Sequence, residues 1–160
     1  MKSVIIYYSY SGNTQKAAEA LSVYLKSEGS QADLIELKCL DEEKSFLLQC
    51  RRAFQHKMGQ LQPVNFDLSV FDLICLGTPV WAFGPAPALN TYLDKCSGVE
   101  GKEVVLFTTY GSGMGNERCL DYMQGILSTK GAKKFKRFSI QQFKINNQEF
   151  VLSKIKQSLK

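Results

Sequence analysis

The chain has 160 residues, 44% of them hydrophobic, which suits one domain spanning residues 1–160 with a full apolar core. Its longest purely aliphatic or aromatic runs, residues 4–8 and 104–107, fall far short of the roughly 20 residues that cross a bilayer, and with no leader-like segment ahead of them we expect a cytoplasmic protein. The net charge of +5 comes without a nucleic-acid recognition motif, and five cysteines with no pair at two-residue spacing, beside one histidine, favour reduced thiols over disulfides or zinc.

Five short apolar runs alternate with segments of helical periodicity. The runs predict strands at residues 4–8, 32–37, 71–76, 103–108 and 135–140. Apolar side chains then recur at three- and four-residue intervals in residues 17–25, 89–96, 119–127 and 151–159. Asn116 is placed to cap the helix that follows the fourth strand. This alternation of strand and helix predicts an α/β fold with a parallel sheet.

The segment between the second and third strands gives a weaker pattern. Phe46, Cys50 and Phe54 recur at four-residue intervals among charged residues, which predicts a helix between residues 41 and 59. An irregular stretch from 60 to 69 should follow it.

Strand composition indicates the order of the sheet. The first, third and fourth strands are nearly continuous apolar runs, as expected for strands buried on both faces, whereas the second and fifth carry charges. The second and fifth are therefore the edges of a doubly wound, five-stranded parallel sheet of order 2-1-3-4-5, with helices on both faces. In this order a ligand crevice forms at the carboxyl ends of the first and third strands, where the connections depart in opposite directions.

The loop after the first strand has the composition of a phosphate cradle. Hydroxyl side chains and a glycine lead directly into a helix whose first N–H groups lack partners, an arrangement that favours a phosphate monoester. No lysine follows the glycine, so a Walker loop is excluded and the phosphate of flavin mononucleotide (FMN) fits better. The same residue types also form ordinary turns and helix caps. The candidate phosphate ligands are Ser9, Tyr10, Ser11, Gly12, Asn13 and Thr14.

The loop after the third strand contains the only tryptophan of the chain. Trp81 lies between a proline and a glycine, where no regular face would bury it, so we expect an exposed ring on which a flat conjugated ligand could stack. The alternative is that Trp81 and Phe83 close the end of the core. The candidate ligand-binding residues of this loop are Thr78, Pro79, Val80, Trp81, Ala82, Phe83 and Gly84.

A glycine-rich loop follows the fourth strand. Three glycines in residues 111–115 let backbone amides approach a ligand, and Tyr110 could close over a ring. The spacing is not that of the dinucleotide-binding fingerprint, which argues against a Rossmann NAD site. The candidate residues are Thr109, Tyr110, Gly111, Ser112 and Gly113.

Together these three loops resemble those of the flavodoxin family, in its short-chain form, and the resemblance covers nearly the whole chain. It implies noncovalent binding of FMN and electron transfer. It also implies that residues 79–84 line one side of the flavin ring and that residues 109–113 line the other. The residues that it implies hold the phosphate are Ser9, Ser11, Gly12, Asn13 and Thr14. No residue of these loops is a candidate acid, base or nucleophile, and no metal site is expected.

The charge of the chain departs from that of acidic electron carriers. Residues 130–160 contain nine lysines and arginines against one acidic residue, Glu149. A solvated face explains this segment, and a docking surface for an acidic redox partner, ferredoxin-like or a reductase, is the alternative. No membrane or nucleic-acid partner is expected, and the oligomeric state stays open.

Three functions are compatible with these features. The leading hypothesis is an FMN-binding electron-transfer protein that shuttles electrons between redox partners. The alternative is an FMN-dependent NAD(P)H oxidoreductase that acts on quinones or other small acceptors. The third is a flavin-free interaction domain, which the three loops make the weakest of the three. Fold alone does not choose between them.

Overall fold

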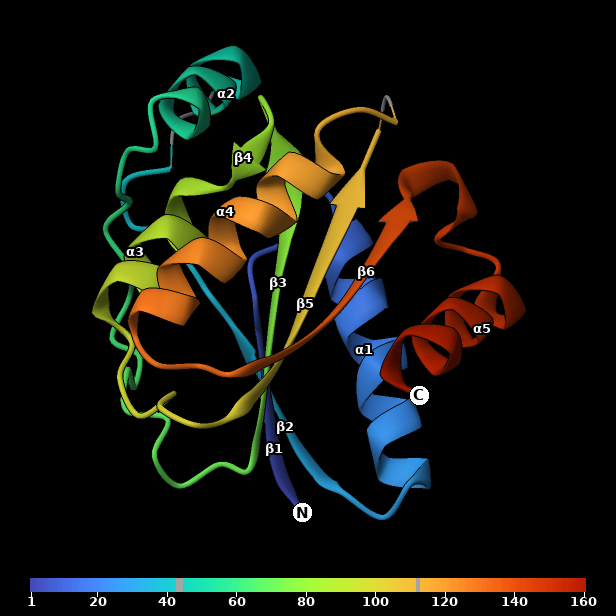
Figure 1. Ribbon diagram of the computed structural model, residues 1–160. Helices are drawn as coiled ribbons and strands as arrows, with labels where there is room; N and C mark the ends of the chain where they lie inside the picture. Colours follow the sequence, from blue (N-terminus) through green and yellow to red (C-terminus); the bar gives the residue numbers. More distant parts are fainter. Residues whose placement is uncertain (43–44, 112) are drawn as a thin grey trace.

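The computed structural model describes residues 1–42, 45–111 and 113–160, which form one parallel sheet between two layers of helices (Figure 1). The strands are β1 (Lys2–Tyr7), β2 (Gln31–Glu36), β3 (Leu73–Trp81), β4 (Gly84–Pro85), β5 (Glu103–Tyr110) and β6 (Lys134–Gln141). The helices are α1 (Asn13–Ser27), α2 (Phe46–Phe54), α3 (Pro87–Lys95), α4 (Asn116–Thr129), the short 3-10 helix η1 (Gln142–Lys144) and α5 (Gln148–Leu159).

The sheet has the predicted topology. Its order is β2-β1-β3-β5-β6, all parallel, and the two-residue β4 pairs antiparallel with the end of β3. The charged strands β2 and β6 form the edges, as expected. Helices α2, α3 and α4 cover one face of the sheet, and α1 and α5 cover the other (Figure 1). The predicted doubly wound α/β fold is therefore confirmed.

The apolar strands are buried on both faces because successive side chains point to opposite sides. Val4, Ile6, Ile74, Leu76, Val104 and Leu106 join the core beneath α3 and α4. Ile5, Tyr7, Leu73, Cys75, Val105 and Phe107 join the core beneath α1 and α5. A continuous apolar run thus supplies both cores at once.

The structure corrects three local predictions. Strand β3 does not end at residue 76 but continues to Trp81, because the chain folds back as a hairpin in which Trp81 pairs with Gly84. Asn116 does not cap α4: it is the first helical residue, and the cap position belongs to Gly115, which has a φ of 87° and no side-chain hydrogen bond. The predicted third loop also begins later, because Thr109 and Tyr110 lie in β5.

The helix predicted between residues 41 and 59 is present as α2, but its apolar side chains face outward. Phe46 and Phe54 are 48% and 63% exposed, whereas Gln49 and Ala53 are buried. Its neighbour in sequence, the stretch 60–69, is irregular as expected. None of the helices that the described residues form is long and apolar enough to cross a membrane.

Candidate functional site

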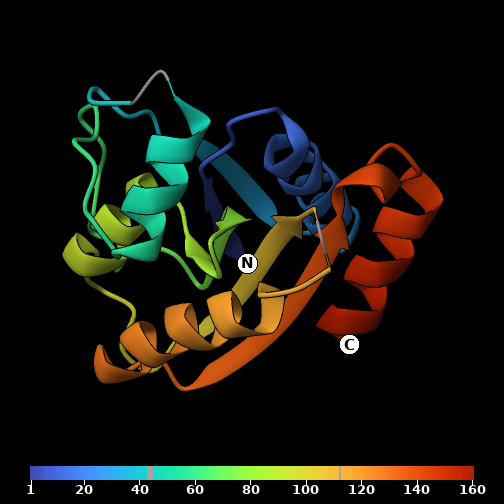
Figure 2. The ribbon, with the colours of Figure 1, turned by 90° about the horizontal axis from the view of Figure 1, so that it is seen from above.

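The carboxyl ends of β1, β3 and β5 meet at one edge of the sheet, and a cleft of about 510 Å³ opens there. This is the switch point of the doubly wound sheet, where ligands of such folds bind. In Figure 2 the sheet is viewed from this end, with α2 over one face of the sheet and α1 over the other. The cleft is lined by Tyr10, Ser11, Thr14, Phe46, Pro79, Val80, Trp81, Thr109, Gly111 and Gln142.

The loop between β1 and α1 leaves its backbone donors free. Gly12 has a φ of 83°, and no atom lies within 4 Å of where its Cβ would be, so the backbone is open to a ligand. Ser9 accepts a hydrogen bond from the Gln15 amide at 3.2 Å. Within the described chain, no protein acceptor binds the amides of Gly12, Asn13 or Thr14. Free amides at a helix N-terminus suit a phosphate.

Thr14 connects this loop to β5. Its hydroxyl oxygen lies 2.8 Å from that of Thr109, and both side chains are buried. Ser11, by contrast, is exposed and accepts a hydrogen bond from the Asn13 amide group at 3.1 Å. The loop therefore has one hydroxyl fixed in the core and one at the surface, on either side of Gly12.

The ring of Trp81 is not exposed, contrary to the sequence-based expectation. It is 5% exposed and makes edge contacts with Tyr8, Tyr10 and Phe46, with ring centroids 5.5–5.6 Å apart. Tyr10 and Phe46 themselves remain about half exposed. The wall of the cleft is thus an aromatic cluster, and a flat ligand would meet the rings of Tyr10 and Phe46 together with what remains open of Trp81.

Arg52, in the last turn of α2, joins this helix to the segments before and after it. The Arg52 guanidinium donates to the Asp41 carboxylate at 2.6 Å and to the carbonyls of Asp41 and Met58 at 2.8 and 3.1 Å. The Gln60 amide donates to the same carboxylate at 2.7 Å. Partial burial would raise the pKa of Asp41, but the Gln60 amide and the Arg52 charge outweigh it and lower that pKa. These contacts fix the end of α2, the helix whose first residue, Phe46, lines the cleft.

Tyr8, the residue after β1, contacts the Trp81 ring of the same wall. Its hydroxyl donates a hydrogen bond to the Glu42 carboxylate, next to Asp41 in the chain. Burial raises the pKa of the Tyr8 hydroxyl above its usual range, and the bond to Glu42 raises it further. Tyr8 therefore stays protonated and serves as a donor that joins β1 to the segment before α2.

Eight of the predicted site residues line the cleft, and the others lie around it or apart from it. Thr78 is fully buried, and its hydroxyl donates to the Pro79 carbonyl and accepts from the Ala86 amide, so it shapes the hairpin instead of lining the cleft. Ser112 lies outside the described residues. The remaining predicted residues do not line the cleft: Ser9, Gly12, Asn13, Ala82, Phe83, Gly84, Tyr110 and Gly113.

Sequence reasoning missed two lining residues. Phe46 reaches the cleft from α2, far from the three loops in sequence, and no local pattern indicates that the outer side of this helix meets Trp81. Gln142 follows β6, which pairs with β5 along its whole length, so its position could have been inferred from the predicted strand order. Among the described residues, those that line the cleft include no Asp, Glu, Lys, Arg, His or Cys. As described, its wall offers shape and hydrogen bonds and no strong acid, base or nucleophile.

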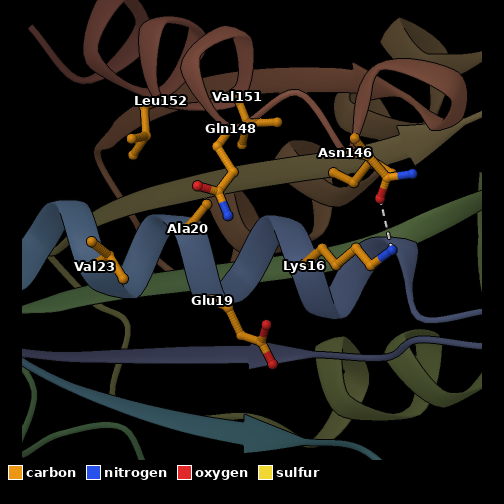
Figure 3. Close-up of a pocket in the computed structure, with 9 residues that line it drawn as sticks. Lys16, Glu19, Ala20, Val23, Asn146, Gln148, Val151 and Leu152 are labelled. Atoms are coloured by element: carbon orange, nitrogen blue, oxygen red, sulfur yellow. Dashed lines mark hydrogen bonds between the residues drawn. The ribbon is translucent and has the colours of Figure 1, made fainter.

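A second cavity of about 400 Å³ lies between α1 and the segment that leads into α5. Figure 3 shows Lys16 pointing to Asn146, with 2.8 Å between the Lys16 ammonium and the Asn146 carbonyl oxygen, while Val23 and Leu152 mark its apolar end. None of the predicted site residues lines it. The cleft at the switch point is therefore the candidate site, because eight of the predicted site residues line it.

The basic segment 130–160 is partly used inside the molecule. Arg137 pairs with Glu117 and Asp121 at 2.7 Å, and Lys136 lies 3.3 Å from Glu103. Lys130 donates to the carbonyls of Asp94 and Cys96. Three of its nine cations thus join β6 and the end of α4 to their neighbours, and a docking role for the others stays a prediction.

Comparison with known families decides the relationship. The family described as NADPH-dependent FMN reductase matches residues 1–144. The chain belongs to this family. Membership in the NADPH-dependent FMN reductase family confirms the predicted flavodoxin-like relationship and FMN as the cofactor. The free amides beside Gly12, the open space above it and the aromatic wall fit such a group, since they offer anion donors at one end and ring surfaces at the other.

Individual relatives agree with this placement of the chain. A curated NAD(P)H dehydrogenase (quinone) from Gluconacetobacter diazotrophicus is 27% identical over 101 residues, which are 61% of this chain and 48% of that protein. The match therefore spans about half the length of that relative.

Solved structures share the fold. An FMN-bound flavoprotein from Lactobacillus acidophilus is 23% identical with a TM-score of 0.67, covering 99% of both chains. Flavodoxin 1 from Bacillus cereus is 18% identical with a TM-score of 0.63, covering 100% of both. An NADH:FMN oxidoreductase is 18% identical with a TM-score of 0.66, covering 98% of this chain and 88% of the other.

Proposed function

We propose that this protein is an FMN-dependent oxidoreductase that takes hydride from NAD(P)H and reduces a quinone or another small acceptor. The observation that carries this proposal is the family match over residues 1–144, supported by the relative named as an NAD(P)H dehydrogenase (quinone). The electron carrier, our leading hypothesis from the sequence, has less support.

The cleft supports the binding that this function needs. The amides of Gly12, Asn13 and Thr14 would hold the FMN phosphate, with Ser11 at its exposed side. Tyr10, Phe46 and Trp81 would flank the ring on one side, and Thr109 and Gly111 would meet it on the other. FMN held in this way would supply the hydride- and electron-transfer chemistry between NAD(P)H and the acceptor. The chain's own part is to orient the ring and exclude water from one side of it.

The first experiment measures FMN retention. The purified protein is mixed with excess FMN, passed through gel filtration and examined by visible absorption. We expect about one FMN per chain, less in Ser11→Ala and unchanged in Ser27→Ala, a matched control whose hydroxyl donates to the Tyr24 carbonyl of its own helix. Equal retention in both variants would contradict the phosphate site.

The second experiment separates enzyme from carrier. FMN-loaded protein is given NADPH or NADH and a soluble naphthoquinone without oxygen, and nicotinamide oxidation is followed by absorbance. Repeated turnover in proportion to added quinone supports the oxidoreductase. Retained FMN without nicotinamide oxidation would contradict it and return the electron carrier to first place.

A further inference from the structure

An aromatic ring and a guanidinium form an exposed pair beside the cleft. Phe83, in the two-residue turn of the β3–β4 hairpin, is 41% exposed, and the guanidinium carbon of Arg118 in α4 lies 5.9 Å from the centre of its ring. This distance is within the range of a cation–π contact. Arg118 is itself exposed, so both groups face solvent.

Phe83 is held at this place by its backbone and by Gly115. Ala82 and Phe83 both have positive φ angles, 46° and 69°, which non-glycine residues rarely adopt and which cost roughly 1 kcal/mol each. The Phe83 ring packs where a side chain at position 115 would be, since a Cβ on Gly115 would lie 2.5 Å from the Phe83 Cδ1. The ring is therefore fixed against the start of α4 and is not a freely moving tip.

Arg118 has no carboxylate partner among the described residues, although acidic side chains lie close by in sequence. Glu117 and Asp121 belong to α4, like Arg118, but both form ion pairs with Arg137 of β6. A planar guanidinium without a carboxylate is suited to bidentate donation to a phosphate. The pair thus offers a cationic hydrogen-bond donor for an anion next to an aromatic face.

The pair also borders the candidate site. Phe83 is two residues beyond Trp81, and Arg118 follows the glycine-rich loop that begins at Gly111; Trp81 and Gly111 both line the cleft. The hairpin and the start of α4 lie at the same end of the sheet (Figures 1 and 2). A ligand that extends out of the cleft between these two loops would meet Phe83 and Arg118.

We propose that Arg118 and Phe83 recognise the adenosine end of the dinucleotide, with Arg118 binding the 2′-phosphate of NADPH and Phe83 stacking on the adenine. Arg118 is then the residue that makes the protein prefer NADPH to NADH. This inference rests on the proposed NAD(P)H-dependent function. We expect a preference of about 10- to 100-fold, which corresponds to about 1.4 to 2.8 kcal/mol.

Calorimetry on the FMN-saturated protein tests the assignment without turnover. Adenosine 2′,5′-bisphosphate and adenosine 5′-monophosphate serve as probes, and the ratio of their dissociation constants reports recognition of the 2′-phosphate. We expect the bisphosphate to bind at least about 10-fold more tightly, with Arg118→Gln bringing the ratio near one and Arg118→Lys retaining part of it. Phe83→Leu should weaken both probes by a similar factor.

Arg51→Gln is the matched control, because Arg51 is also an exposed arginine but lies on α2, away from the cleft lining. Its ratio should equal that of the unaltered protein, and circular dichroism establishes that each variant is folded. A ratio near one in the unaltered protein, or a ratio retained in Arg118→Gln, would overturn the proposal. Failure of the proposed function would show instead as absence of NADPH and NADH oxidation, which the probe titrations do not require.

Discussion

Thr14 and Thr109 share a hydrogen bond of 2.8 Å between their hydroxyl oxygens, although 95 positions separate them in the chain. Thr14 is the second residue of α1, beside the free amides, and Thr109 is near the end of β5; both line the cleft. The bond joins the two sides of the candidate site and fixes the distance between phosphate loop and ring wall.

We expect the two threonines to be energetically coupled. Thr14→Val or Thr109→Val alone leaves a buried hydroxyl without its partner and should lower the free energy of unfolding by ~1 to 3 kcal/mol. The double variant should lose less unfolding free energy than the sum of the two single variants, because neither buried hydroxyl then remains without its partner. Urea unfolding of the FMN-free protein measures this, with Thr129→Val, at an exposed position, as control. Strict additivity would show that the bond is not formed.

Two glycines should respond very differently to alanine. Gly12→Ala has open space around the new methyl group and meets only the cost of a positive φ, about 1 kcal/mol. Gly77→Ala would place a Cβ 2.1 to 2.6 Å from the Phe107 ring, which stacks on Phe138 at 5.3 Å, and should cost about 3 kcal/mol or more. The urea midpoints of the two variants measure this difference. Equal losses of stability would contradict the close packing of Phe107 against Gly77.

Phe46 and Phe54, at the two ends of α2, provide a matched test of the aromatic wall. Phe46 lines the cleft and contacts Trp81, whereas Phe54 is exposed elsewhere. Phe46→Ala should weaken FMN binding severalfold, because a ring contact contributes ~0.5 to 1.5 kcal/mol beyond burial, and Phe54→Ala should not. Quenching of Trp81, the only tryptophan, during FMN titration gives both dissociation constants. Weaker binding in Phe54→Ala alone would place the ring elsewhere.

The Asp41 and Arg52 pair should stabilise the protein in a pH-dependent way. The folded-state pKa of Asp41 is lowered, so its contribution is present above the unfolded value of about 3.9 and is lost as pH falls through the folded value. Asp41→Asn should therefore lose stability at pH 7, by roughly 1 kcal/mol or less because the pair is partly exposed, and should converge with the unaltered protein at low pH. Urea unfolding at pH 7, 4 and 2.5 measures the difference. Asp33→Asn, on edge strand β2, is the control, and a constant gap at all three pH values would refute the linkage.

Local sequence determined the fold. Apolar runs such as residues 4–8 and 103–108 can bury both of their faces only between two layers of helices. The charges in residues 32–37 and 135–140 leave those strands at the edges of the sheet. Strand order then determines which loops meet, since parallel strands end at the same edge. The sequence alone therefore assigns three segments to one cleft: the phosphate loop, the segment around Trp81 and the residues after β5.

Contacts between distant segments were decided only by the tertiary structure. Trp81 is buried because Tyr8, Tyr10 and Phe46 close on it from other elements, and no local pattern specifies that meeting. Likewise, the outward-facing apolar side of α2 and the pairing of Phe83 with Arg118 depend on how separate segments pack. Periodicity records which side chains of one element share a face, but the partner of that face is set by the packing of the whole chain.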